Sequence, residues 1–376
     1  MRNLRYIALF ILLLVIGSCG RKQKTQEDSS KFQRSLPEFA TRFSFGQFKG
    51  FDVIFLHNPW QPDIVEHQIL CVPRDEKIPS DSNNFKIIRT PLKKMVSMSG
   101  TQIASIAIIN ELPSIKGVGD KNLVKQPYLK KRLKNGKVRQ IGSNGNFNYE
   151  GLIALDPELI LVSPFKGQTY EKLTELGMVI LPYADYMERH PLGRAEWIKL
   201  MGMLYEKEEA ANSYFRDVRR RYQQTKSLAS EANHHPTVFS GKPYGGVWYM
   251  PGGESYMAHF FKDAGANYLW KDNQQAASMS LDFETVYAKA ARADFWKLVV
   301  KSDKPYSYDR LLAEDERYAD FRAFKKRNLL ICNVAKSSYY EKGALEPDII
   351  LADFIKAFHP ELLQDHQPKY FKILRN

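Results

Sequence analysis

Cysteine is scarce in this sequence. The 376 residues include 3 cysteines, Cys19, Cys71 and Cys332, which is too few for the disulfide framework of a small secreted domain. A chain of this length buries enough apolar surface to fold without covalent staples. Cys71 and Cys332 could form one disulfide, but two separate buried thiols are the interpretation that we favour.

The common catalytic motifs are missing as well. No Gly-x-Ser-x-Gly, His-Glu-x-x-His or Cys-x-x-Cys segment occurs, which removes frequent signatures of hydrolases, zinc proteases and dithiol enzymes. Gly117-Val118-Gly119 lacks the third glycine of a dinucleotide-binding turn. We therefore expect no catalytic residues and no cofactor. An envelope hydrolase with a triad drawn from distant loops is the weakest alternative.

The apolar run at the start of the chain is too short to span a membrane, which takes about 20 residues. It extends from Tyr6 to Ile16 after Arg2 and Arg5, the layout of a secretory signal peptide. The sequence IGSC at 16–19 resembles the bacterial lipobox, which implies cleavage before Cys19 and acyl chains on that cysteine. An ordinary signal peptide with an incidental cysteine is the alternative.

Acidic residues are fewer than basic residues. The chain has 55 Lys and Arg against 42 Asp and Glu, a formal net charge of +13, which ordinarily favours nucleic acid as a partner. Export removes that partner, so we expect none. Nine of the basic residues and one acid, Asp120, lie between Lys116 and Arg139. We expect a solvated basic insertion there, with a contact to anionic headgroups or an acidic ligand as the alternative.

Strand and helix patterns alternate along the rest of the chain, as in a mostly parallel sheet covered by helices. A small antiparallel β region is expected first, in three strands: 51–56, 67–72 and 85–90. The first α/β series has strands 94–97, 158–163 and 178–182 with helices 102–110, 148–155 and 169–176. The second has strands 237–240, 247–250, 294–300 and 328–333 with helices 255–264, 284–291 and 348–358.

An apolar stripe links the two series. Apolar residues recur at steps of three and four from Trp197 to about Glu231, which predicts an amphipathic helix up to ~50 Å long. Tyr205-Glu206 marks a possible kink or break. The expected fold class is therefore α/β, with two Rossmann-like lobes joined by a single long helix.

The expected domain boundaries follow from these patterns. They are a signal peptide at 1–18, a flexible tether at 19–36, an N-terminal β region at 37–92 attached to the first lobe, a first lobe at 93–195, a connecting helix at 196–232 and a second lobe at 233–376.

The order of several short motifs resembles the periplasmic binding proteins of iron–siderophore and cobalamin importers. This class (class III) has two lobes joined by one rigid helix. The matching segments are NYEGLIALDPELILV at 148–162, LDFETVYA at 281–288 and EPDIILADF at 346–354. The segments PLGRAEW at 191–197 and VWYMPGGES at 247–255 resemble a branch found in lipoproteins of Bacteroidetes. The resemblance covers roughly residues 85 to 363.

The resemblance implies two docking residues, one on each lobe, that bind arginines of the transporter. The matching positions are Glu150 and Glu284. Each lies near a helix N-terminus, where the helix dipole stabilises a carboxylate, and each could receive a bidentate guanidinium. The alternative is that each glutamate only caps its helix.

Ligand contacts are expected from loops at the carboxyl ends of the strands, on both sides of the cleft. Aromatic side chains there would stack on a flat ligand, and basic ones would balance an anionic ligand. The expected ligand-binding residues are Ser99, Thr101, Lys166, Tyr183, Arg189, Tyr244, Trp248 and Tyr249.

A transition-metal site in the cleft would need about three histidines and a carboxylate that converge. His190, His259 and the pair His234-His235 are spread singly along the chain, so we expect no metal ligands. A zinc- or manganese-binding protein of the same fold stays open as the alternative function.

The expected function is the lipid-anchored solute-binding component of an ABC importer. Its ligand would be an iron–siderophore, haem or corrinoid-type molecule held between the lobes. Its partners would be permease subunits with ATPase subunits behind them, and the protein would act as a monomer. Basic residues directly after Cys19 favour an envelope location that faces the periplasm.

Overall fold

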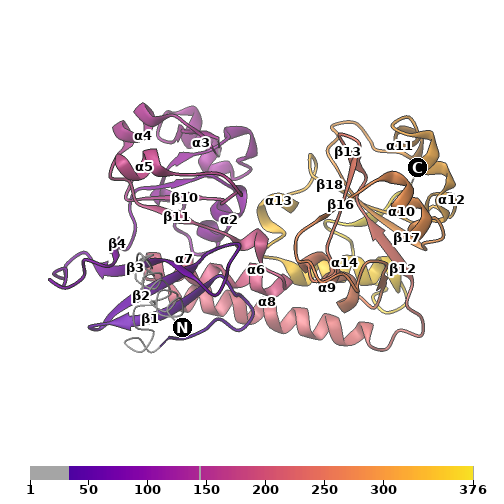
Figure 1. The fold of residues 1–376 in the computed structure, drawn as a ribbon, viewed down its shortest axis with the longest axis horizontal. Helices are drawn as coiled ribbons and strands as arrows, with labels where there is room; N and C mark the ends of the chain where they lie inside the picture. The colour runs from indigo at the N-terminus through magenta and orange to yellow at the C-terminus, as the bar shows by residue number, and fades with distance from the viewer. Residues whose placement is uncertain (1–33, 144, 376) are drawn as a thin grey trace, which may run out of the picture. The chain divides into compact units, whose positions relative to one another are not determined.

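Two α/β lobes make up most of the computed structural model, which describes residues 34–143 and 145–375 (Figure 1). The expected signal peptide, Cys19 and most of the expected tether lie outside these residues. The class III α/β architecture predicted from the sequence is confirmed. No helix in the described part of the chain combines the length and the apolar character that a membrane crossing requires.

The first lobe is built on a parallel five-stranded sheet with strand order β11-β10-β5-β6-β7. All residues of β5 and β10 are buried, which explains their uninterrupted apolar sequences. The strands are β5 (Met95–Ser97), β6 (Ile115–Val118), β7 (Arg139–Gln140), β10 (Leu159–Val162) and β11 (Ile180–Pro182). The helices are α2 (Gly100–Ile108), α3 (Pro127–Lys134), α4 (Tyr149–Leu155) and α5 (Glu171–Glu175), beside a small hairpin of β8 (Gly142–Ser143) and β9 (Asn146–Phe147).

The second lobe repeats the plan with strand order β15-β12-β17-β18-β19, parallel except for the last strand. The strands are β12 (Thr237–Ser240), β15 (Asn267–Tyr268), β17 (Phe295–Val300), β18 (Leu329–Asn333) and β19 (Lys372–Ile373). A separate antiparallel sheet contains β13 (Pro243–Tyr244), β14 (Val247–Met250) and β16 (Met279–Leu281). The helices are α9 (Tyr256–Asp263), α10 (Phe283–Ala290), α11 (Tyr308–Leu312), α12 (Arg322–Lys325), α13 (Tyr339–Lys342) and α14 (Pro347–Phe358).

A four-stranded sheet precedes the first lobe, with β1 (Phe43–Phe48), β2 (Phe51–His57), β3 (Val65–Pro73) and β4 (Lys86–Thr90). The prediction of an antiparallel region is right for β2 and β3 and wrong for β4, which pairs parallel to β3. The strand β1, antiparallel to β2, was not predicted. A parallel pair needs a crossover of about a dozen residues, and the segment 74–85 supplies it.

The segment before β1 is held by two buried carboxylates. Glu196 accepts the backbone amides of residues 38, 39 and 40 at 2.9, 2.7 and 2.9 Å. Glu188 accepts the backbone amide of Thr41 at 2.9 Å and the indole N–H of Trp197 at 2.9 Å. A carboxylate that receives several N–H donors tolerates burial well. These bonds therefore fasten the segment before β1 to Glu188 and Glu196.

The predicted continuous helix at 196–232 is wrong in one respect. The structure breaks it into α6 (Pro191–Glu196), α7 (Ile198–Tyr205) and α8 (Glu208–Ala229). Glu206 adopts a left-handed conformation with φ of 54°, so the chain reverses and α7 packs on α8. A Cβ atom at Gly202 would lie 2.7 Å from the Cβ of Ala211, so glycine permits this close approach.

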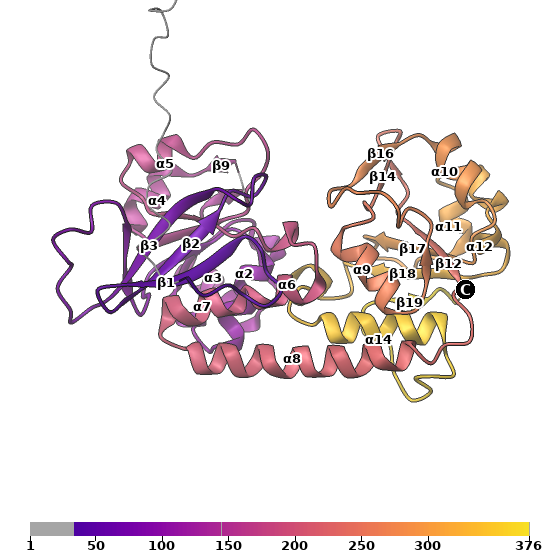
Figure 2. The same ribbon diagram turned by 60° about the horizontal axis from the view of Figure 1, so that its bottom comes forward.

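Helix α8 carries the chain from the first lobe to the second. Its 22 residues span about 33 Å at 1.5 Å per residue, less than the ~50 Å expected from the stripe. Figure 2 shows α8 running beneath both lobes, with α14 of the second lobe alongside it. Phe215, Val218 and Tyr222 of its apolar stripe are buried.

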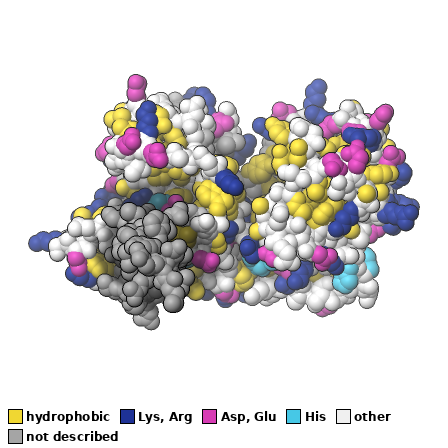
Figure 3. Space-filling view, viewed as in Figure 1, with side chains coloured by type: hydrophobic (Ala, Val, Ile, Leu, Met, Phe, Trp, Pro, Cys, Tyr) yellow, Lys and Arg dark blue, Asp and Glu magenta, His cyan; other side chains and the backbone are white. Residues whose placement is uncertain are grey.

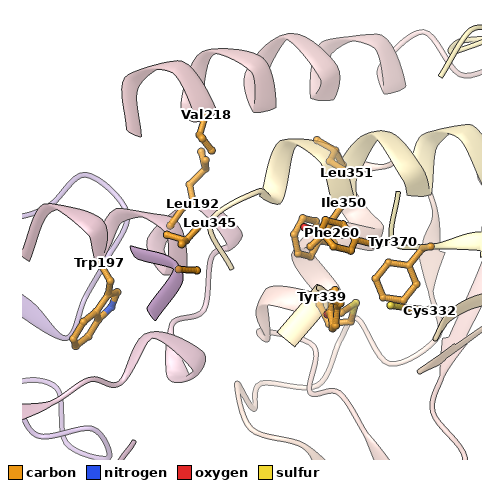
Figure 4. Close-up of a cluster of buried hydrophobic side chains, with 14 of the residues drawn as sticks. Leu192, Trp197, Val218, Phe260, Cys332, Tyr339, Leu345, Ile350, Leu351 and Tyr370 are labelled. Atoms are coloured by element: carbon orange, nitrogen blue, oxygen red, sulfur yellow. The ribbon is translucent and has the colours of Figure 1, made fainter. Parts of the chain in front are cut away.

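One hydrophobic cluster continues from the first lobe into the second along α6, α8 and α14. Figure 4 shows Val218 of α8 pointing toward Leu192 of α6 and Leu345, with Ile350 and Phe260 farther into the second lobe. Close-packed interiors resist rearrangement, so we expect the two lobes to move little relative to each other. Cys71 and Cys332 are both free and buried, which confirms the expectation of two separate thiols.

Candidate functional site

A cavity of about 270 Å³ lies between the two lobes. Figure 3 shows the notch between them on the side away from α8. The first lobe contributes loops that follow β5, β10 and β11, at the carboxyl ends of its parallel strands, where open α/β sheets bind ligands. The wall is formed by Ser99, Thr101, Ser163, Phe165, Asp185, Tyr186 and Arg194 with Tyr256, Tyr339, Tyr340 and Ala344 of the second lobe.

The loop after β5 is rigid. Ser99 caps α2, and the side chain of Gln102 returns the bond in a capping box, a reciprocal arrangement that fixes the start of a helix. The Thr101 hydroxyl donates to the Tyr340 carbonyl across the lobe boundary at 3.2 Å. Gln126 donates to Glu341 at 2.9 Å beside it. These bonds position α13 against α2 at the cavity wall.

Arg194 of α6 is the one cationic residue in the cavity wall. Its side chain is 14% exposed and donates to Asp185 at 3.2 Å. The guanidinium carbon lies 4.4 Å from the centre of the Tyr256 ring, a cation–π distance. Its Nε is buried without a hydrogen-bond partner among the described residues. Arg194 therefore lines the cavity and keeps one N–H donor, at Nε, that no described residue accepts.

The charges of Arg194 and Asp185 depend on the groups around them. Burial lowers the pKa of Arg194, but Tyr256 and Asp185 more than offset that effect and leave the pKa above its usual value. Burial raises the pKa of Asp185, and Arg194 opposes the rise. The guanidinium is therefore a permanent cation in a partly dry site, which favours an anionic guest.

Aromatic side chains supply much of the remaining wall. Phe165 and Tyr340 are 52% and 65% exposed, so their faces are open for stacking on a flat ligand. Burial raises the pKa of Tyr186 to about 12 and the pKa of Tyr339 well above its usual value. Both phenols are therefore neutral at physiological pH.

Six of the eight predicted ligand-binding residues are on the surface or in the cavity wall. Ser99 and Thr101 line the cavity. Lys166 is exposed next to Phe165, and Arg189 forms an ion pair of 2.6 Å with Glu254 near the start of α9. Tyr244 and Tyr249, which are 82% and 50% exposed, belong to the β13–β14 hairpin and not to the cavity wall.

Tyr183 and Trp248 are core residues, and their prediction as ligand contacts is corrected here, since neither has any exposed surface. The Tyr183 hydroxyl lies 3.2 Å from Ser105. Trp248 donates to the Ser240 carbonyl at 2.9 Å. Successive side chains of a strand point to opposite faces, so Trp248 turns inward where Tyr249 turns outward.

The sequence interpretation missed Asp185, Arg194, Tyr256 and Tyr339. Arg194 lies inside the segment 191–197, which was singled out for its family resemblance and not for chemistry. The available signal was Pro191, which suits the first position of a helix and does begin α6. A helix placed there would have turned Arg194 toward the cleft.

Glu150 and Glu284 lie in the first turns of α4 and α10, and both side chains are exposed. The caps are other residues: Asn148 accepts the Gly151 amide at 2.8 Å, and Asp282 accepts the Thr285 amide at 2.6 Å. Both glutamates are therefore free of a capping role. Figure 1 shows α4 and α10 on the side of the lobes away from α8.

The histidines do not converge on the cavity. His190 and His259 are neighbours, with ring centres 5.4 Å apart, and burial followed by the nearby His259 lowers the pKa of His190 to about 4. Neither lines the cavity wall. Within residues 34–143 and 145–375, the one cluster with metal-ligand geometry lies elsewhere on the second lobe.

Comparisons with known proteins agree with this geometry. A family model described as "Periplasmic binding protein" matches residues 100–334. An uncharacterized lipoprotein of Methanocaldococcus jannaschii is 29% identical, over 97% of this chain and 94% of its own. The fold also matches solved structures at low identity. An ABC-type Fe³⁺-hydroxamate transport system protein from Saccharomonospora viridis has a TM-score of 0.56 at 17% identity, over 72% of this chain and 94% of its own. A periplasmic heme-binding protein from Pseudomonas aeruginosa has a TM-score of 0.56 at 18% identity, over 72% and 93%.

Proposed function

Because the chain belongs to the periplasmic binding protein family, we propose that it is the lipid-anchored solute-binding component of an ABC importer. Its ligand is an anionic iron–siderophore, haem or corrinoid-type molecule that sits between the lobes and is delivered unchanged to the permease. Binding proteins of such importers work with permease and ATPase subunits. We expect this one to act as a monomer with no nucleic-acid partner.

The observation that supports an anionic ligand most strongly is Arg194, a largely buried guanidinium that lines the cavity and has one N–H donor without a partner among the described residues. Charge-assisted hydrogen bonds are about twice as strong as neutral ones. The exposed faces of Phe165 and Tyr340 suit a flat, delocalised ligand. Two structures of the same fold carry titles that name an Fe³⁺-hydroxamate system and heme, which supports the ligand class.

The cavity, at about 270 Å³, is slightly smaller than the usual range for ligand sites, roughly 300–1,000 Å³. A haem-sized molecule would fill it and extend into the notch. The transition-metal alternative has less support, because the cavity wall among the described residues holds no cluster of histidine, cysteine or carboxylate ligands.

Native mass spectrometry of the full-length protein purified from its host tests the proposed function. We expect one small molecule per chain, with a mass that stays constant on prolonged incubation. Turnover of the bound molecule would favour the hydrolase. A zinc or manganese ion that is bound in place of any small molecule, and that the His234→Ala variant also retains, would favour the metal-binding alternative.

We also propose that acyl chains on Cys19 anchor the protein in the cell envelope, facing the periplasm. The relative from Methanocaldococcus jannaschii is named a lipoprotein, which supports an anchor. Each buried methylene contributes about 0.8 kcal/mol, and several chains together hold a protein firmly. We expect Cys19→Ala to move the protein from the membrane to the soluble fraction, while Cys71→Ala stays membrane-bound. Retention of the Cys19→Ala protein in membranes would contradict the anchor.

A further inference from the structure

Three potential metal ligands meet at the far end of the second lobe, outside the cavity. His234 follows α8, His359 ends α14, and Glu361 lies two residues later. One ligand atom from each lies within 4.8 Å of the other two. Figure 3 shows histidine side chains side by side on the surface at the lower right of this lobe.

His359 is the unusual member. Its side chain is fully buried, and its Nδ1 has no hydrogen-bond partner among the described residues. Its Nε2 lies against the backbone of Gly265, with which it hydrogen-bonds. Its Nδ1 lies 4.0 Å from the Glu361 carboxylate. A buried polar group without a partner costs roughly 1–3 kcal/mol, so a native structure ordinarily supplies one.

The other two ligands can complete the site. His234 and Glu361 are exposed, so both side chains can turn without disturbing the core. A tetrahedral zinc ion with bonds of about 2.0–2.1 Å places its ligand atoms about 3.4 Å apart. The ligand atoms lie within 4.8 Å of one another, so the distances between them must shorten by at most about 1.4 Å. The two exposed side chains can provide this movement around a fixed His359.

The chemistry selects the kind of ion. Two imidazoles and a carboxylate form a typical zinc ligand set that leaves a fourth position for water, whereas Mg²⁺ and Ca²⁺ prefer oxygen ligands alone.

We propose that His234, His359 and Glu361 bind one divalent transition-metal ion, best matched by Zn²⁺, at a surface site separate from the ligand cavity. The ion ties the segment after α8 to the end of α14. An ion that binds only the folded state stabilises it, so this site fastens the connecting helix to the second lobe.

Titration with ZnCl₂ tests the site on the full-length protein in detergent, treated with chelator and carrying no polyhistidine tag. We expect one Zn²⁺ per chain by calorimetry and a higher unfolding temperature with Zn²⁺ but not with Mg²⁺. His234→Ala and Glu361→Gln should each weaken Zn²⁺ binding at least tenfold; both positions are exposed, so the variants should fold.

His235→Ala is the matched control, because this histidine is adjacent and exposed but its Nδ1 is already bonded to Gly265. We expect it to bind Zn²⁺ like the wild type. The proposal is overturned if the wild type shows no saturable Zn²⁺ binding, if His234→Ala and Glu361→Gln bind as the wild type does, or if His235→Ala loses as much affinity as His234→Ala. Retention of the cavity ligand should be the same in all of these variants, so the two proposals fail separately.

Discussion

Replacing Arg194 with glutamine should weaken retention of the cavity ligand by about 10- to 100-fold. A hydrogen bond to a charged group contributes about 1.5–3 kcal/mol, and each 1.4 kcal/mol is a factor of ten in affinity. Arg194 is the cation in the cavity wall, so no neighbouring residue of that wall can replace its charge. Calorimetry with the ligand identified by mass spectrometry measures the effect.

The same substitution should also destabilise the protein, because Asp185 loses its ion pair at 3.2 Å and is 6% exposed. Breaking a buried pair typically costs about 3–5 kcal/mol. Burial already raises the pKa of Asp185, and loss of Arg194 should raise it further. An acid whose folded pKa is raised loses stability as the pH rises above its unfolded pKa, so the variant should be less stable at about pH 8 than at about pH 5 in urea unfolding.

Two variants separate binding from folding. Asp185→Asn combined with Arg194→Gln leaves a neutral pair, and we expect it to recover much of the stability but not the affinity. Arg216→Gln removes an exposed arginine of α8 and should change neither. If Arg194→Gln folds and holds the ligand as tightly as the wild type, Arg194 is not the anion-binding residue.

Reversing the charge at both predicted docking positions, Glu150→Arg with Glu284→Arg, should abolish uptake and leave ligand affinity intact. Both side chains are exposed, and that of Glu284 is 77% exposed with an ion pair of 3.4 Å to Arg317. The family resemblance implies permease arginines opposite both positions, and like-charge juxtaposition in an interface costs several kcal/mol. Uptake of labelled ligand by cells should fall below about a tenth of the wild-type rate.

A control must carry the same change in net charge. The control Glu209→Arg with Glu231→Arg makes the same charge change at exposed positions, one in α8 and one just after α8. Helix α8 is on the other side of the lobes from α4 and α10 (Figure 2). We expect normal uptake from this control. Wild-type uptake by the Glu150→Arg, Glu284→Arg protein, or a loss of its ligand affinity, would contradict docking through these residues.

The buried strands could be predicted because the residues of each strand are themselves apolar. The segment 159–162 is apolar throughout, since β10 is covered on both faces. A break at Tyr205-Glu206 was expected as an alternative, but the reversal of the chain after α7 could not be predicted in the same way. The apolar stripe continues through it, and the reversal depends on the left-handed Glu206 and on close contact at Gly202, which a periodic pattern does not encode.

The residues of the cavity wall likewise divide into those that the sequence predicts and those that it does not. Ser99 and Thr101 follow a strand of a parallel sheet, so their position was predicted from one rule about sheet edges. Arg194, Tyr256 and Tyr339 come from three helices far apart in the sequence and meet only because the shared core fixes the lobes. The prediction that Trp248 contacts the ligand was wrong because aromatic residues suit a packed core and a ligand site equally well.

The most direct measurement is a crystal structure of the protein purified together with its own ligand. We predict one intact ligand between the lobes, with an anionic group about 3 Å from the Arg194 guanidinium and an aromatic face against Phe165 or Tyr340. A ligand bound anywhere else on the protein, or one with its neutral part against Arg194, would contradict capture of an anionic guest in this cavity.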